Sequence, residues 1–291
     1  MAITGLAMAL ALLTQTSPQA QERAPDTIED VIVSAPDAGR IESFASAFLE
    51  PARLGPNEGQ IARWNEKLCV RVIGGAPEVN TALKGQIEDA FRSLDVPLKP
   101  LPCRNPNVMV VIADNATGFS RVFADRYSNR MFANRRGDMT AFVEPSRPVR
   151  WQHRTKTVGL NTAPLIENAA GSGNVAQVRS ANSRLSFSVA EEVDRAMLVI
   201  DPRRIGDTPS RGLAAYVAFA TLLDLPLQPD TTGRDTILNL FEPGGPTDLT
   251  PWDRALIAGV YSMTAGQPFR NQQSQIERVM QRSLSGGEGA R

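Results

Sequence analysis

Residues 68–115 contain a short apolar run, then apolar residues at helical spacing, then a second short apolar run. The runs LCVRVIGG and NVMVVIADN are short and apolar, which is typical of buried strands. Between them the apolar residues recur at helical spacing: Val79, Leu83, Ile87, Phe91 and Leu94. Pro77 suits the first turn of that helix. We therefore predict a strand–helix–strand unit with parallel strands.

The same patterns predict the other elements. Arg40–Leu49 and Ala116–Asn134 each carry an apolar helical face, and Asp114-Asn115 is suited to cap the second helix. Thr140–Val158 alternates loosely and favours a hairpin or edge strands. The segments SRLSFSVAEEV and RAMLVID are predicted to be strands. A loop is expected over 161–174, a modest helix at QSQIERVMQRSL and a disordered tail at SGGEGAR.

The segment from Ser210 to Tyr261 has a recognisable order. It predicts a helix over SRGLAAYVAFATLLDLPLQPD, a tight segment TTGRDTILNLFEPG and a closing helix over LTPWDRALIAGVYS. This order resembles the C-terminal half of the zincin metallopeptidases, especially the matrixin-like ones. In that family a long H-E-x-x-H helix precedes a turn and a closing helix. The resemblance implies a zincin-like α+β fold.

The residues that this family uses for chemistry are replaced here. The two zinc-ligand positions carry Val217 and Thr221, and the general-base position carries Ala218. The usual glycine becomes Asp224, and the third ligand position becomes Leu227. None of the three ligand positions carries a metal ligand. Because the helix is apolar nearly all round, we expect it to be buried on both sides, with Asp224 marking the face that reaches solvent.

The composition agrees with a protein that has no catalytic zinc. The chain has one histidine, His153, and two cysteines in 291 residues. A catalytic zinc site needs three protein ligands and an open position, so we expect no metal and no other cofactor. The 31 basic and 31 acidic residues cancel, which argues against nucleic acid as a partner.

The N-terminus has the pattern of an export signal. The apolar run from Ile3 to Leu13 is followed by polar residues, and Ala20 suits a cleavage site. We predict a signal peptide over residues 1–20, a flexible leader over 21–39 and a periplasmic or secreted location. A buried N-terminal helix is the alternative. Because no other run reaches about 18 apolar residues, no transmembrane segment is expected.

An exported protein folds in an oxidising compartment, where pairs of cysteines commonly form disulfides. Cys69 and Cys103 each lie near the start of a predicted strand, at the same end of a parallel pair. We predict a disulfide between them, as is usual in oxidising compartments. The alternative is two buried free thiols.

Two polar clusters are candidate sites. Arg150, Trp151, His153 and Arg154 are predicted to form a basic rim on an edge strand. Such a rim suits an anionic glycan, a lipid headgroup or a peptide carboxylate, although a solvated edge strand with protective charges explains it equally. A second cluster, Glu191, Glu192, Asp194 and Asp201, offers paired carboxylates of the glycosidase kind, or ion pairs with neighbouring arginines.

Together these observations predict a zincin-like domain over 40–268 and a C-terminal helix and tail over 269–291. The expected fold is a mixed sheet with backing helices, a central helix without its catalytic residues and a C-terminal helical subdomain. Residues 40–261 also resemble a group of exported bacterial proteins without an assigned activity, through ARWNEKLCV, PCRNPNVMVVIAD, RAMLVID and DTILNLF. We expect a non-catalytic binding or accessory module of the cell envelope, whose partner is a protein, peptide or glycan. The alternative is an envelope hydrolase with a zinc-independent carboxylate site.

Overall fold

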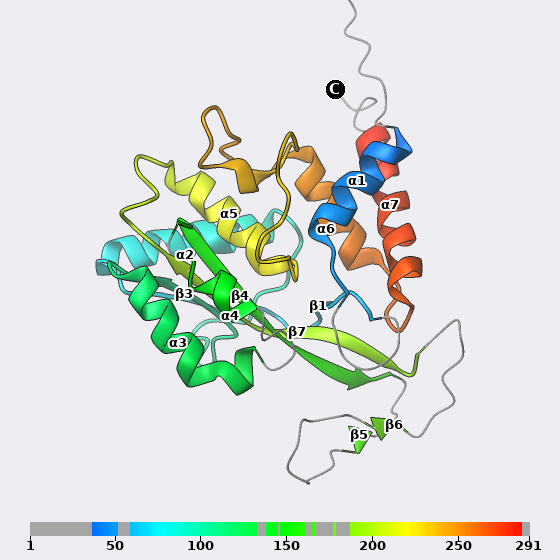
Figure 1. Ribbon diagram of the computed structural model, residues 1–291, viewed down its shortest axis with the longest axis horizontal. Coiled ribbons are helices and arrows are strands. Elements are labelled where there is room, and N and C mark those ends of the chain that lie inside the picture. The colour runs from blue at the N-terminus through cyan, green and yellow to red at the C-terminus, as the bar shows by residue number, and fades with distance from the viewer. Residues whose placement is uncertain are drawn as a thin grey trace, which may run out of the picture. The chain divides into compact units, whose positions relative to one another are not determined.

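The structure is a computed structural model that describes residues 37–51, 59–132, 138–144, 146–160, 165–166, 177–178 and 187–286 (Figure 1). The expected signal peptide, the leader up to residue 36, most of the loop at 161–174 and the last five residues of the tail lie outside the described residues. Within the described part of the chain, no helix has the length and apolar character needed to cross a membrane.

A mixed five-stranded sheet forms the centre of the described chain (Figure 1). Its strands are β1 (Arg63–Trp64), β2 (Val70–Ile73), β3 (Val108–Ile112), β4 (Val149–Gly159) and β7 (Val189–Ile200). Strands β2, β3 and β7 are parallel neighbours in that order, and β1 also runs parallel to β7. Strand β4 pairs with β7 in the antiparallel direction. The two short strands β5 (Leu165–Ile166) and β6 (Gln177–Val178) pair only with each other among the described strands.

The strand–helix–strand prediction is confirmed. Helix α2 (Pro77–Arg92) connects β2 to β3, and Val70 pairs with Val108. The turn before α2 requires glycine at Gly74, because its φ is +96° and a Cβ would lie 2.1 Å from the carbonyl oxygen of Ile112. One residue of the predicted apolar face differs: the side chain of Val79 is exposed.

One prediction about the strands is confirmed in the main and another is wrong in part. The segments SRLSFSVAEEV and RAMLVID, predicted to be strands, both contribute to one continuous strand, β7 (Val189–Ile200), whose register is irregular near Asp194. Residues 140–142, expected to be extended, belong to helix α4 (Asp138–Phe142). The buried ring of Phe142 contacts Phe123 and Phe132 there, and this packing favours the helical turn.

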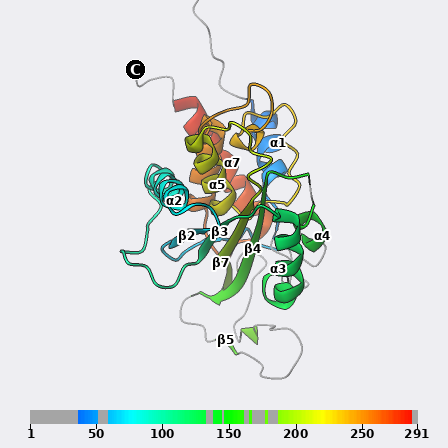
Figure 2. The same cartoon turned by 90° about the vertical axis from the view of Figure 1, so that its left-hand side faces the viewer.

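Helices cover β4 on both faces, although it lies at the edge of the sheet (Figure 2). Side chains alternate across a strand. Gln152 donates to a backbone carbonyl of α3 (Ala116–Met131), whereas the ring of Trp151 contacts Tyr216 on α5 (Ser210–Leu222). Helix α3, capped by Asn115 as predicted, therefore lies on one face of β4, and α5 lies on the other beside α2.

The remaining helices pack against α5 or against one another. They are α1 (Ala38–Phe48), the 3₁₀ helix η1 (Ile237–Asn239), α6 (Pro251–Ser262) and α7 (Phe269–Ser285). Helix α7 packs against α6 and α1, and Ile276 and Met280 join the common buried cluster. Asp253 joins η1 to α6, because its carboxylate accepts hydrogen bonds from Thr236 Oγ1 and the Ile237 amide. Burial raises the pKa of Asp253 to about 6.

Candidate functional site

The helix that resembles a zincin active-site helix is closed to metal and water. Val217, Ala218 and Thr221 are all 0% exposed. The Thr221 hydroxyl donates to the Val217 carbonyl over 2.7 Å, and the Thr221 carbonyl accepts from Trp64 Nε1 over 2.7 Å. Among the described residues, no three His, Cys, Asp or Glu side chains form a group that suits a metal ion. The prediction that α5 is buried on all sides is confirmed.

The prediction for the end of this helix is wrong. Asp224 does not mark a solvent-facing side, because it is buried. Its Oδ1 lies 3.7 Å from Nδ1 of His153, and Nε2 of that histidine lies 3.2 Å from the Thr221 carbonyl oxygen. The imidazole of His153 on β4 therefore lies against the carboxyl end of α5, beside the buried carboxylate of Asp224.

Glu191 is a third buried titratable group. Its Oε1 accepts a hydrogen bond from Thr157 Oγ1 over 2.8 Å, and its Oε2 has no hydrogen-bond partner. Burial, with a smaller contribution from the nearby charge of Asp224, raises the pKa of Glu191 to about 7. The group lines neither of the two cavities described below.

The residues predicted to form a basic rim do not form one. Arg150, Trp151 and His153 are buried, at 0%, 2% and 6% exposure. Because β4 is covered on both faces, Arg150 points to α3 while Trp151 and His153 point to α5. Arg154 forms a bidentate ion pair with Asp194. The expected rim is therefore divided between two faces of the strand.

The carboxylates proposed as a glycosidase-like pair also separate. Asp194 pairs with Arg154, and Glu192 lies 3.7 Å from the ammonium of Lys156. Asp201 pairs with arginines at the other end of β7. These contacts agree with the predicted ion pairs, and they do not bring the four carboxylates into one catalytic centre.

A cavity of about 490 Å³ opens where β4 begins and β7 ends. We call it the arginine pocket, and it is lined by Ser146, Arg147, Pro148, Val149, Arg203, Arg204, Tyr216, Leu238, Phe241 and Glu242. The start of β4, the loop after β7, helix α5 and the segment around η1 each contribute to its wall. The carboxyl ends of parallel strands are where open α/β sheets commonly bind ligands.

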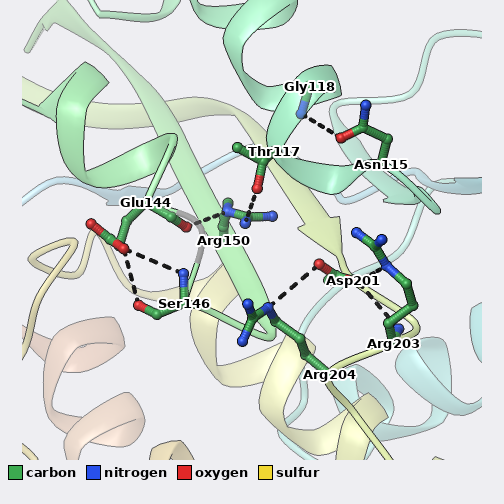
Figure 3. Close-up of polar contacts among 9 residues, drawn as sticks. All are labelled: Asn115, Thr117, Gly118, Glu144, Ser146, Arg150, Asp201, Arg203 and Arg204. Carbon is green, nitrogen blue, oxygen red and sulfur yellow. Dashed lines mark hydrogen bonds and ion pairs between the residues drawn. The ribbon is translucent and has the colours of Figure 1, made fainter.

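The side chains of Arg203 and Arg204 both contact the buried carboxylate of Asp201 (Figure 3). Asp201 Oδ1 accepts from the Arg203 amide over 3.1 Å and from its Nε over 3.3 Å. Arg204 Nε lies 3.7 Å from Oδ2 of the same aspartate. Asp201 is 1% exposed, whereas the side chains of Arg203 and Arg204 are 67% and 46% exposed. One aspartate therefore holds two cations at the mouth of the pocket.

Arg150 lies beside this pair with its hydrogen-bonding capacity incompletely used (Figure 3). Its Nε donates to the Glu144 carbonyl over 2.9 Å, and Nη2 donates to Thr117 Oγ1 over 3.0 Å. Nη1 is buried and has no hydrogen-bond partner among the described residues. Burial lowers the pKa of Arg150, which also lies within the fields of Arg147, Arg204 and Asp201.

Arg147, which is half-buried, is the second cation that lacks an anionic contact among the described residues. Its guanidinium lies 5.1 Å from the ring centroid of Trp151. Burial lowers its pKa, and no hydrogen bond or ion pair joins it to another described residue. The rings of Tyr216 and Phe241, with centroids 5.2 Å apart, form an aromatic wall in the same pocket. The arrangement suits an anion attached to an apolar group.

A second cavity, of about 480 Å³, lies beside the start of β3 and the middle of β7. Its carboxylates Glu66 and Asp194 are already paired with Lys156 and Arg154. Its wall also carries Lys99 and Arg195 but no aromatic side chain, unlike the wall of the arginine pocket.

The sequence reasoning missed the importance of Arg203, Arg204, Tyr216 and Phe241, and it placed Arg150 on the wrong kind of surface. A signal was present: Pro202, Arg203 and Arg204 follow directly after the predicted strand RAMLVID. Polar residues at the carboxyl end of a parallel strand are candidates for ligand binding.

Comparison with family models, with curated proteins and with solved structures finds no match to this chain. The disulfide prediction is independent of any relative. Cys69 and Cys103 are joined, with their Cα atoms 6.0 Å apart, and no free cysteine is present in the described chain.

Proposed function

We propose that this protein is an exported, zincin-like binding module of the cell envelope that has no catalytic site and holds an anionic group of its partner in the arginine pocket. The observation that carries this proposal is the incomplete compensation of two guanidinium groups, that of the buried Arg150 and that of the half-buried Arg147. Arg150 Nη1 has no acceptor, and Arg147 has no anionic contact among the described residues. Buried cations are stable in proteins mainly when an anion or acceptor completes them.

Further observations support the other parts of the proposal. An antiparallel edge strand on an otherwise parallel sheet, followed by α5, η1 and α6, has the order that the zincin resemblance implies. The burial of Val217, Ala218 and Thr221 supports the absence of metal chemistry. The disulfide and the apolar N-terminal run support export.

Small anions test the binding site directly. Acetate and inorganic phosphate are titrated into the protein at fixed ionic strength, and binding is followed through the NMR signals of the arginine Nε–H groups. We expect at least one of the two anions to shift the signals of Arg203 and Arg204. Arg204→Gln should weaken that binding by roughly tenfold or more, because hydrogen bonds to charged groups contribute about 1.5–3 kcal/mol.

Arg211→Gln is the matched control. Arg211 is an exposed arginine at the start of α5, it pairs with Asp248, and its loss removes the same single charge outside the pocket. Its substitution should leave anion binding unchanged. The proposal is wrong if the natural protein binds neither anion, or if both variants bind as the natural protein does.

A further inference from the structure

The positive and negative side chains around the arginine pocket nearly cancel and leave a small net positive charge. Four arginines contribute: Arg147, Arg150, Arg203 and Arg204. Three carboxylates oppose them: Glu144, Asp201 and Glu242. Four against three leaves one positive charge, so a ligand with one negative charge completes the site. A phosphate dianion would leave an uncompensated negative charge beside Asp201.

The shape of an arginine side chain favours the same ligand. The planar guanidinium fork matches a carboxylate through two parallel hydrogen bonds. Arg203 and Arg204 already use this capacity in part on the carboxylate of Asp201, each through its Nε. Their side chains are 67% and 46% exposed, so their terminal nitrogens can donate to a second carboxylate.

The walls on either side of the arginines differ in polarity. Tyr216, Leu238 and Phe241 form an apolar side. Ser146 and Glu242 are exposed and provide polar groups at the mouth. A volume of about 490 Å³ lies within the range of roughly 300–1,000 Å³ that is usual for small-ligand sites. An apolar side chain fits one wall while amide groups meet the other, whereas an alkyl chain would leave the polar groups desolvated.

We propose that the arginine pocket binds the free C-terminal carboxylate of a peptide chain whose last residue is apolar. This inference rests on the proposed function and narrows it to one class of ligand. The carboxylate lies between Arg203, Arg204 and Arg147, with Arg150 behind them as a buried positive charge. The last side chain packs on Tyr216 and Phe241, and the preceding amide lies at the polar mouth.

The experiment compares peptides on the natural protein, so that it does not depend on a variant that folds. N-acetylated tetrapeptides of three alanines and a final leucine are prepared with a free carboxylate and with a C-terminal amide. Affinities are measured by calorimetry. We expect the amide to bind roughly tenfold more weakly or worse, because the charge-assisted hydrogen bonds to arginine are lost. A final alanine should also bind several-fold more weakly than leucine, because less apolar surface is buried.

Substitutions then test whether these differences in peptide affinity arise in the arginine pocket. Arg204→Gln should remove most of the difference between acid and amide, whereas Arg211→Gln should keep it. Phe241→Ala should reduce the preference for leucine over alanine and keep the preference for acid over amide. A thermal melt confirms that each variant is folded.

The outcomes separate this inference from the proposed function. Equal binding of acid and amide overturns the inference, and so does tighter binding of octanoate or inorganic phosphate than of the free-acid peptide. In either case acetate or phosphate binding that depends on Arg204 would leave the proposed function intact. Failure of all these anions to bind overturns both.

Discussion

At the scale of single residues, the buried charges of this protein differ in how well they are compensated. Arg154 and Asp194 satisfy each other through two hydrogen bonds. Glu191 keeps one carboxylate oxygen without a partner in the interior. An unpaired buried carboxylate is costly when ionised, so its protonation should be coupled to stability.

We predict that Glu191 makes the protein less stable as pH rises. Its pKa is about 7 in the folded protein against 4.5 for an ordinary glutamate. Below pH 4.5 the carboxyl is protonated in both states, and between 4.5 and 7 only the folded state retains the proton. The free energy of unfolding therefore falls through this range, by roughly 3 kcal/mol at most.

Glu191→Gln should remove this part of the pH dependence. Thermal or urea unfolding at pH values from 4.5 to 8 measures it, and the variant should show a flatter curve than the natural protein. Asp253, whose pKa is about 6, contributes with the same sign and is present in both proteins. Glu192→Gln is the control, since Glu192 pairs with Lys156. Parallel curves for the natural protein and Glu191→Gln would contradict the prediction.

At the scale of elements, α5 is an interior helix and not the floor of a cleft. Phe219 is 0% exposed, and its ring meets Phe48 of α1 edge to face with centroids 6.1 Å apart. Phe44 of the same helix contacts Trp252 on α6, with ring centroids 5.0 Å apart. Helix α1 thus contributes to the burial of α5.

Phe219→Ala should therefore lower the free energy of unfolding by about 3–5 kcal/mol, through lost burial and a residual cavity. Urea denaturation measures this change. Val122→Ala on α3 is the control, because Val122 is 66% exposed and its loss should change stability by less than about 0.5 kcal/mol. A change for Phe219→Ala as small as that of the control would show that α1 does not cover α5 in solution.

Placing the H-E-x-x-H residues of zincins on α5 should not create a metal site. The triple variant Val217→His, Ala218→Glu and Thr221→His places three polar side chains where each original side chain is fully buried. We expect a large loss of stability, zinc well below one ion per chain, and no cleavage of casein. Melting curves and elemental analysis after removal of loosely bound ions test this. A normally folded variant that holds one zinc would mean that the helix faces an open cleft.

Local periodicity predicts elements in this chain well, and it fails where burial depends on distant partners. The helix at 77–92 and its flanking strands follow from spacing alone. Nothing near Asp224 in sequence shows that it is buried, because its partner His153 lies 71 residues earlier. Arg150 is likewise buried only because Thr117 and Glu144 supply acceptors from other elements. The arginine pocket is assembled from four segments, so no single stretch of sequence reveals it.

At the scale of the whole molecule, one covalent link closes the strand–helix–strand unit. Cys69 lies directly before β2 and Cys103 lies in the segment before β3, with 34 residues of separation. In the folded protein the parallel pairing of these strands already holds both cysteines near each other. The link therefore restricts mainly the unfolded chain.

Reduction of this disulfide should destabilise the protein. A loop of 34 residues corresponds to about 3.5–4 kcal/mol on the chain-entropy model. For a domain of this size that change lowers the melting temperature by about 10 °C. Melting with and without reductant measures it, and a variant with Cys69→Ala and Cys103→Ala should be insensitive to reductant. Alkylation of denatured, unreduced protein should label no thiol. Two labelled thiols in protein isolated from an oxidising compartment would show that the strands hold together without the bond, and that the link is not part of the native molecule.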